Sequence, residues 1–175
     1  MEQAQLSNLL GALSLTLSDA QQAAAKEASG LSPSACATIA TLGPYPGSTI
    51  GAVARVMGVT HSVAVRLVED LVQAGLIERG PRPDRRQVAL RLSAKGAQTR
   101  QAILSARNGV LTDALAALGA DEHRLLGDML SSMLTRLTRS REKADHICRL
   151  CDEDVCTPRR CPVEREAVRL AGEAP

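Results

Sequence analysis

Apolar residues recur at helical spacing along most of this chain. One helical face carries Leu6, Leu9, Leu10, Leu13 and Leu17, which predicts a first helix over residues 4–28. Serine, threonine or aspartate before an apolar run is a typical helix start, because its side-chain oxygen accepts a free backbone N–H. Helices are therefore also predicted over residues 33–42, 49–57, 61–74, 94–118 and 122–137, with caps at Ser32, Ser48, Thr60, Ser93 and Asp121.

The segment from Leu76 to Leu92 has the alternating pattern of a β-hairpin. Residues 76–79 form the first predicted strand, and Val88, Leu90 and Leu92 alternate with polar or small residues in the second. The loop between these strands is rich in arginine and proline. The pattern therefore predicts a mainly α fold with one small β-hairpin, followed from Asp145 onward by a short, charged and separate appendage.

The composition favours packed helices. Apolar residues make up 45% of the 175 residues, yet there is one Tyr and no Phe or Trp, so the core must consist of Leu, Ala, Val, Ile and Met. No run approaches the roughly 18 apolar residues of a membrane span. Glu2 lies where a signal peptide would carry positive charge. We expect a cytoplasmic protein without a membrane partner.

Positive charge is concentrated in the middle of the sequence. The chain has a net charge of +2, but residues 55–100 carry nine Lys or Arg against four Asp or Glu. Residues 1–54 and 101–175 are both slightly negative by the same count. A basic segment of this kind can attract the phosphate backbone of nucleic acid.

The two helices around Gly58 have the proportions of a helix-turn-helix. A short turn lets the second helix project into the major groove of DNA, where its leading residues reach base edges. Those residues are Thr60, His61 and Ser62, and Arg66 lies one turn further along. The following hairpin carries Arg82, Arg85 and Arg86 on a proline-stiffened loop, which suits the minor groove. The sequence therefore predicts a winged helix-turn-helix.

Three stretches of this unit resemble the MarR family of transcription regulators. They run from Gly51 to Ser62 (GAVARVMGVTHS), from Arg66 to Arg79 (RLVEDLVQAGLIER), and from Asp84 through Arg86 to the motif LRLSAKG ending at Gly96. The Asp-x-Arg wing followed by Leu-x-Leu-Ser-x-x-Gly is a fairly specific signature of the family. The chain departs from the family pattern at Val63 and Val65, where Thr or Ser is usual, which suggests apolar contacts to thymine methyls or weakened DNA binding.

The resemblance implies a dimeric, non-enzymatic regulator that binds a pseudo-palindromic operator in double-stranded DNA. It implies that Asp84 holds Arg86, which enters the minor groove. It divides residues 1–145 into dimerisation helices (1–30 and 94–145) and a winged helix-turn-helix (31–93). The cysteine-rich tail (146–175) is not a feature expected of most members of the family. We expect a homodimer, because the apolar stripes of residues 6–24 and 126–137 exceed what one small domain can cover. A small-molecule effector would be a further ligand, and the sequence does not identify one.

The tail has four cysteines in the spacing C-x2-C-x4-C-x4-C. Cys148, Cys151, Cys156 and Cys161 lie within fourteen residues, and four thiolates at this density can bind zinc or an iron–sulfur cluster. The spacing resembles a zinc knuckle with Cys at the third position in place of His, and the charged residues between the ligands suit a zinc turn. The terminal Cys-Pro resembles the cluster loop of SoxR-type redox regulators. The sequence does not decide between zinc and an iron–sulfur cluster, and a disulfide switch is a third alternative. We expect the centre to tune DNA binding.

Other functions are compatible with parts of the sequence. Cys148 and Cys151 could serve a thiol redox protein, although the βαβ context of thioredoxin-like motifs is missing. A metal-stapled protein-interaction module without a DNA target is a further alternative, and salt-dependent DNA binding would separate it from a regulator. Neither a Ser/His/Asp arrangement nor a phosphate loop is visible, which favours a non-enzymatic function. Cys36, between two alanines, is interpreted as a small buried hydrophobe.

Overall fold

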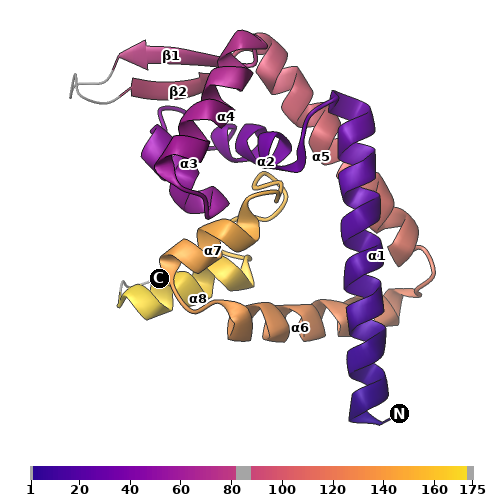
Figure 1. The fold of residues 1–175 in the computed structure, drawn as a ribbon. Helices are drawn as coiled ribbons and strands as arrows, with labels where there is room; N and C mark the ends of the chain where they lie inside the picture. Colours follow the sequence, from indigo (N-terminus) through magenta and orange to yellow (C-terminus); the bar gives the residue numbers. More distant parts are fainter. Residues whose placement is uncertain (1, 82–87, 173–175) are drawn as a thin grey trace.

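The computed structural model describes residues 2–81 and 88–172, which form eight helices and one β-hairpin (Figure 1). The helices are α1 (Gln3–Ser29), α2 (Pro33–Leu42), α3 (Ile50–Met57), α4 (His61–Gln73), α5 (Ala94–Leu115), α6 (Ala120–Leu137), α7 (Arg141–Cys148) and α8 (Pro162–Ala171). Strands β1 (Ile77–Pro81) and β2 (Val88–Leu92) pair antiparallel, with Ile77 opposite Leu92 and Pro81 opposite Val88. The predicted mainly α fold with a small hairpin is confirmed.

Helix α2 lies at the centre of the main core. Its residues Ile39 and Leu42 are almost completely buried, and they belong to one cluster with Val68 of α4, Leu90 of β2 and Ile103 of α5. The cluster contains only aliphatic residues, alanines and Cys36, as the composition requires. Burying these side chains against one another stabilises the winged unit, because each removes apolar surface from water.

Two helices leave apolar faces uncovered. Helix α1 packs along α5, and its N-terminal half extends well beyond the rest of the chain (Figure 1). Leu6, Leu9, Leu10 and Leu13 on that half are each about half exposed, from 47% to 53%. Helix α6 has no buried residue, and Leu125, Met129, Leu130, Met133 and Leu137 are exposed on it. Within residues 2–81 and 88–172, no other element covers these exposed apolar side chains.

Helices α7 and α8 and the connection between them, residues 141–172, form a small unit that we call the cysteine lobe. The lobe packs against α3 and α6, so the prediction of a separate appendage was wrong (Figure 1). Its own core consists of Ala144, Cys161, Val163 and Ala167. Helix α7 begins before the expected boundary at residue 145, because Ser140 caps it by accepting the backbone N–H of Lys143.

Two predicted helix caps lie elsewhere in the structure. The cap of α3 is Thr49, whose hydroxyl accepts the N–H of Ala52, because Ser48 is held in extended pairing with Leu90. Helix α6 begins after Gly119 rather than after Asp121, because the carboxylate of Glu122 reaches back to accept the Gly119 N–H at 2.7 Å.

Among the described residues, no single helix is long and apolar enough to cross a membrane. Only α3 and α4 taken together reach the required length and hydropathy, and that pair is bent by 111°.

Candidate nucleic-acid interface and cysteine cluster

The turn between α3 and α4 is built by Gly58 and Thr60. Gly58 has φ of 66°, a left-handed conformation that glycine adopts without steric cost, and its N–H closes the end of α3. The Thr60 hydroxyl accepts the N–H of Val63 at 3.4 Å and so begins α4. Together these residues produce the short, sharply bent connection of a helix-turn-helix.

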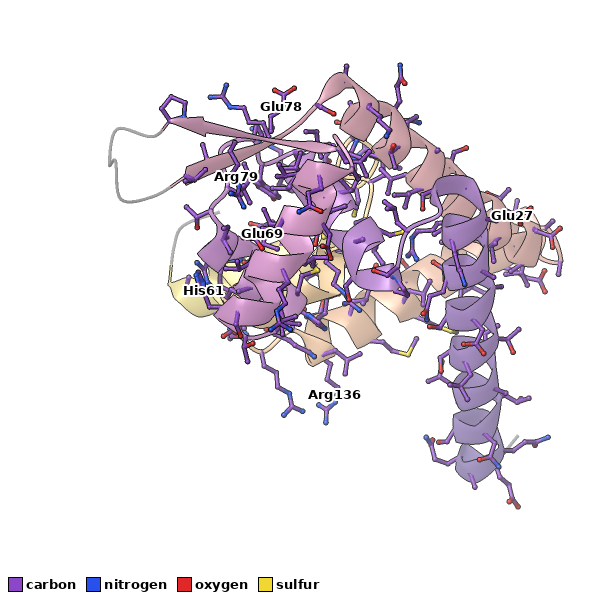
Figure 2. All side chains as sticks on the ribbon, turned by 45° about the horizontal axis from the view of Figure 1, so that its top comes forward. Glu27, His61, Glu69, Glu78, Arg79 and Arg136 are labelled. Carbon is purple, nitrogen blue, oxygen red and sulfur yellow. The ribbon has the colours of Figure 1, made fainter. Side chains whose placement is uncertain are left out.

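The leading end of α4 presents exposed side chains on one face. His61, Ser62, Val63 and Arg66 are exposed, while Ala64, Val68 and Leu71 on the opposite face are buried. Figure 2 shows His61 at this end of α4 and Arg79 on the neighbouring strand β1. The predicted DNA-reading side chains of α4 are thus available to a large partner. Val63 is 48% exposed and adds an apolar contact surface between them.

The hairpin is tied to the helix-turn-helix at its root. Ser48, just before α3, pairs with Leu90 of β2, because the Leu90 N–H donates to the Ser48 carbonyl at 2.8 Å and the Gly47 N–H donates to the Leu90 carbonyl at 2.8 Å. The segment before α3 therefore continues the sheet of β1 and β2 beyond the two strands.

The motif LRLSAKG fixes the start of α5 against the end of α4. Ser93 donates its hydroxyl to the carbonyl of Gly75 at 2.6 Å, and Lys95 donates to the carbonyl of Ala74 at 2.9 Å. A side chain at Gly96 would collide with the carbonyl of Leu76. The glycine of this motif is therefore explained by close backbone packing.

Arg82, Asp84, Arg85 and Arg86, the predicted wing-tip residues, lie outside the residues that the structure describes. Their predicted contacts with DNA and the predicted Asp84–Arg86 pairing remain predictions. The strands on either side run up to residues 81 and 88.

The cysteine lobe contacts the winged unit through single polar pairs. His146 of α7 lies 2.8 Å, Nδ1 to oxygen, from the carbonyl of Val56 near the end of α3, and its ring also faces Gly58. Thr41 of α2 donates its hydroxyl to the carbonyl of Arg149 at 3.3 Å. No local sequence pattern around His146 indicates this contact, because its partner lies ninety residues away.

Two further pairs involve acidic residues that follow Cys151. Tyr45 donates its hydroxyl to Glu153 at 2.8 Å, and burial together with this hydrogen bond raises the pKa of Tyr45 above its ordinary range. Arg100 of α5 lies 3.8 Å from Asp152. The lobe is thus connected to α2, α3, α5 and the loop after α2.

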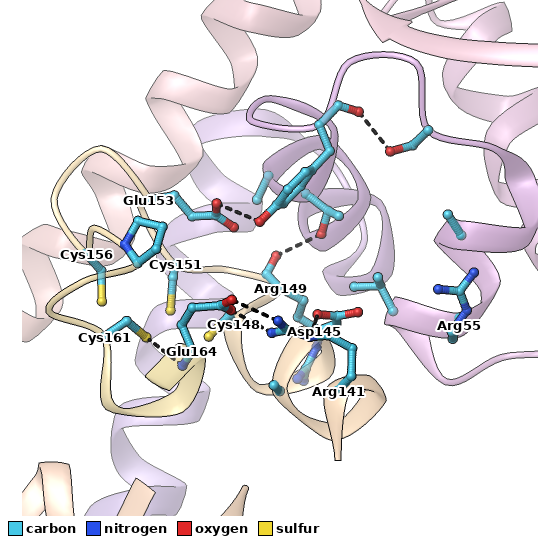
Figure 3. Close-up of a pocket in the computed structure, with 18 of the residues that line it drawn as sticks. Arg55, Arg141, Asp145, Cys148, Arg149, Cys151, Glu153, Cys156, Cys161 and Glu164 are labelled. Carbon is cyan, nitrogen blue, oxygen red and sulfur yellow. Dashed lines mark hydrogen bonds and ion pairs between the residues drawn. The ribbon is translucent and has the colours of Figure 1, made fainter. Parts of the chain in front are cut away.

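The four cysteines of the lobe converge on one region (Figure 3). Cys148 ends α7, Cys161 caps α8, and the other two lie in the connection between them. Cys161 is buried, and Cys148, Cys151 and Cys156 are half-buried. All four line a cavity of about 430 Å³ between the lobe and helices α2 and α3.

The thiols influence one another's pKa values. Hydrogen bonding to Cys151, burial and the charge of Cys151 raise the pKa of Cys148 well above its ordinary range. The same hydrogen bond, opposed by burial and helped by the charge of Arg107, lowers the pKa of Cys151 to about 7. Burial and the neighbouring Cys161 raise the pKa of Cys156 to about 11. The sulfurs are therefore close enough to share protons.

The cysteines are not arranged as a closed metal site. Within residues 2–81 and 88–172, no group of three or more His, Cys, Asp or Glu side chains has the geometry to hold a metal ion, and all five cysteines are free thiols. The donor set is nevertheless of the right type, since four thiolates suit zinc or iron–sulfur clusters. Binding would require the four sulfurs to adjust around the ion or cluster.

Cys36 lies apart from this cluster, in the main core. It is 2% exposed, and its sulfur lies 3.5 Å from the hydroxyl of Ser29. Its burial agrees with the interpretation of a small hydrophobic core residue.

Residues 29–87 match the model of the MarR family. The matched segment begins at the end of α1 and contains α2, the helix-turn-helix and β1. None of the curated proteins matches the chain.

Solved structures match the fold over a larger part of the chain. FabT of Streptococcus pneumoniae, solved in complex with DNA, is 19% identical with a TM-score of 0.68, over 78% of this chain and 97% of that one. YusO of Bacillus subtilis is 22% identical with a TM-score of 0.65, over 76% and 97%. A probable transcriptional regulator from Pseudomonas aeruginosa is 25% identical with a TM-score of 0.56, over 73% and 98%. The chain therefore has the winged-helix fold of MarR-type regulators, and its segment 29–87 carries that family's sequence pattern.

Proposed function

We propose that this protein is a dimeric transcription regulator of the MarR type that binds a pseudo-palindromic operator in double-stranded DNA. The observation that carries the proposal is the exposed leading end of α4, which projects from a glycine turn beside a hairpin rooted on the same unit. A helix held in this way can enter the major groove while the hairpin reaches the neighbouring minor groove. FabT, which has the same fold, was solved in complex with DNA.

Thr60, His61, Ser62 and Arg66 are the proposed major-groove residues. The hydroxyls and the imidazole can exchange hydrogen bonds with base edges, and the exposed Val63 can contact thymine methyls. On the hairpin, Arg82, Arg85 and Arg86 are the proposed minor-groove residues, with Asp84 as the partner of Arg86. The charges of residues 55–100 supply the non-specific attraction to phosphates.

We expect Arg86→Ala to weaken operator binding by about 1–3 kcal/mol, because a minor-groove arginine contributes on that order. The matched control is Arg165→Ala, which removes an equal charge from an exposed position on α8. Binding to a duplex selected from a randomised library, titrated against salt, measures both affinity and the number of phosphate contacts. Equal losses in the two variants would mean that the wing does not contact DNA, and no salt-dependent binding at all would refute the proposed function.

The proposed homodimer uses the uncovered faces of α1 and α6. A second copy would cover the exposed leucines of α1 and the exposed apolar residues of α6, which have no partner within the chain. We expect Leu13→Glu to shift the protein from dimer to monomer in sedimentation, because it buries a charge in the interface. Leu15→Glu is the control, since Leu15 is 68% exposed and lies away from this stripe. A wild-type monomer at micromolar concentration would contradict the proposal.

We also propose that the cysteine lobe modulates DNA binding. The lobe contacts Val56, two residues before the turn that positions α4. A change in the order of the lobe would therefore alter the position of α4, the proposed major-groove helix, without any contact between the lobe and DNA.

A further inference from the structure

The four cysteines are carried to one side of the lobe by three consecutive turns. The backbone N–H of Cys151 donates to the Cys148 carbonyl at 2.8 Å, that of Cys156 to Asp152 at 2.9 Å, and that of Cys161 to Thr157 at 2.9 Å. Each turn thus begins or ends at a cysteine. A chain that needed these residues only as small hydrophobes would not require a turn at each of them.

The sulfur of Cys161 also receives a backbone hydrogen bond. The N–H of Glu164, in the first turn of α8, donates to Cys161 Sγ at 3.5 Å (Figure 3). Hydrogen bonds from backbone N–H groups and the positive end of a helix both stabilise a thiolate, and both are common around metal-bound cysteine. Half-buried Arg107 lies near enough to Cys151 to stabilise negative charge there as well.

The apolar core of the lobe is too small to account for its order. Four residues, two of them alanines, are buried in it, and the connection from Arg149 to Arg160 contains no helix or strand. The partly buried side chains around this core are Leu134, Ile147, Cys148 and Cys156. Small units with so little core usually depend on a metal or on disulfides, and the four thiols are free.

We propose that Cys148, Cys151, Cys156 and Cys161 together hold one thiophilic metal centre, a zinc ion or an iron–sulfur cluster. When hydrated Zn²⁺ binds, four Zn–S bonds replace the bonds from the ion to water, and the protons that the thiols still hold pass to solvent. When a preassembled iron–sulfur cluster is transferred from a carrier protein, the four thiols replace the carrier's thiolate ligands on iron. The protons of the four thiols pass to the released ligands or to solvent. The irregular connection allows the sulfurs to close around either centre.

Residues next to the four cysteines connect the metal centre to the helix-turn-helix. The regulatory effect inferred from this connection rests on the proposed DNA-binding function. His146 and Arg149 lie within two residues of Cys148, and Asp152 and Glu153 follow Cys151. These four residues make the polar contacts to Val56, Thr41, Arg100 and Tyr45. Ordering the ligands therefore orders every one of these contacts, and with them the end of α3.

The site is tested by metal analysis and visible absorption of protein purified without oxygen. We expect about one zinc ion per chain without visible absorption, or iron and sulfide with a cluster spectrum. The variant with all four cysteines changed to Ser should lose the metal, whereas Cys36→Ser should retain it. A quadruple variant that keeps its metal would overturn the proposal.

A second measurement needs no variant. Alkylation of the stripped wild-type protein should modify all four thiols, and reloading with Zn²⁺, or with iron and sulfide, should protect these four together while leaving Cys36 unaffected. Partial protection, or protection that a reductant removes in the absence of metal, would overturn the proposal and indicate disulfides instead.

The coupling is tested with His146→Ala, which removes the contact to Val56 and none of the four ligands. In the wild type we expect loaded and stripped protein to differ in affinity for the selected duplex by about tenfold. The His146→Ala variant should still bind the metal, and the ratio between its loaded and stripped affinities should fall towards one. Equal affinities in the wild type would refute the coupling alone, whereas failure of both forms to bind DNA would refute the proposed function and leave the metal analysis standing.

Discussion

The winged unit and the cysteine lobe are held together by different forces. The winged unit buries a cluster of aliphatic side chains from α2, α3, α4, α5 and the hairpin, with Ile39, Val68, Leu90 and Ile103 fully enclosed. The lobe buries four small residues and packs on Leu134 of α6, and its polar contacts with the winged unit are a few hydrogen bonds and the Arg100–Asp152 ion pair. Apolar burial gives a stable body, whereas a few polar contacts give an attachment that a ligand can strengthen or weaken. The lobe is therefore the part of this molecule suited to respond to conditions.

The largest expected effect is in the core of the winged unit. Leu90→Ala should lower the free energy of unfolding of the whole protein by about 2–5 kcal/mol, because it leaves a cavity at a fully buried position. Val163→Ala in the lobe should leave the main unfolding transition unchanged and raise amide exchange only in α7 and α8. Denaturant unfolding measures the free energy of the main transition, and hydrogen exchange measures the local opening of α7 and α8. A loss of main-transition stability in Val163→Ala would show that the two regions unfold as one.

A smaller effect is expected from the ion pair between α7 and α8. Arg141 donates two hydrogen bonds to Glu164, at 2.8 and 2.6 Å, which raises the pKa of Arg141 and lowers that of Glu164 from its ordinary value of 4.5. The pair is partly exposed, so Glu164→Gln should cost less than about 1 kcal/mol.

The pH dependence of this contribution follows from the lowered pKa of Glu164. The unfolded chain takes up the proton first, so the stabilisation is fully present above pH 4.5 and is lost as the pH falls through the lower pKa of the folded state. Amide exchange of α8 in metal-free protein should differ between wild type and Glu164→Gln at neutral pH and converge in acid. A difference that persists in acid would mean that the glutamine disturbs packing rather than charge.

The helix-turn-helix could be predicted from the sequence because its determinants are local. Gly58 and Thr60 define the turn within three residues, and the buried positions of α4 recur at helical spacing. The hairpin was predicted to within two residues for the same reason. The caps of α3 and α6 were misplaced by one or two residues, because a β-bridge and a glutamate side chain decide them.

The docking of the cysteine lobe could not be predicted in the same way. The pair of His146 and Val56 joins positions ninety residues apart, and that of Tyr45 and Glu153 joins positions 108 apart. Neither residue of either pair belongs to a periodic pattern. The spacing of the cysteines did indicate that they would gather, because tight turns between them leave few other arrangements.

The bridge between Ser48 and Leu90 has a consequence for the shape of the proposed operator. It joins the segment before α3 to β2 by two backbone hydrogen bonds, which restrain the hairpin relative to the helix-turn-helix. The spacing between the bases read in the major groove and the step read in the minor groove is then set by the protein. We expect a half-site lengthened by one base pair between these two contacts to bind more weakly, because one of the contacts is then out of phase with the duplex.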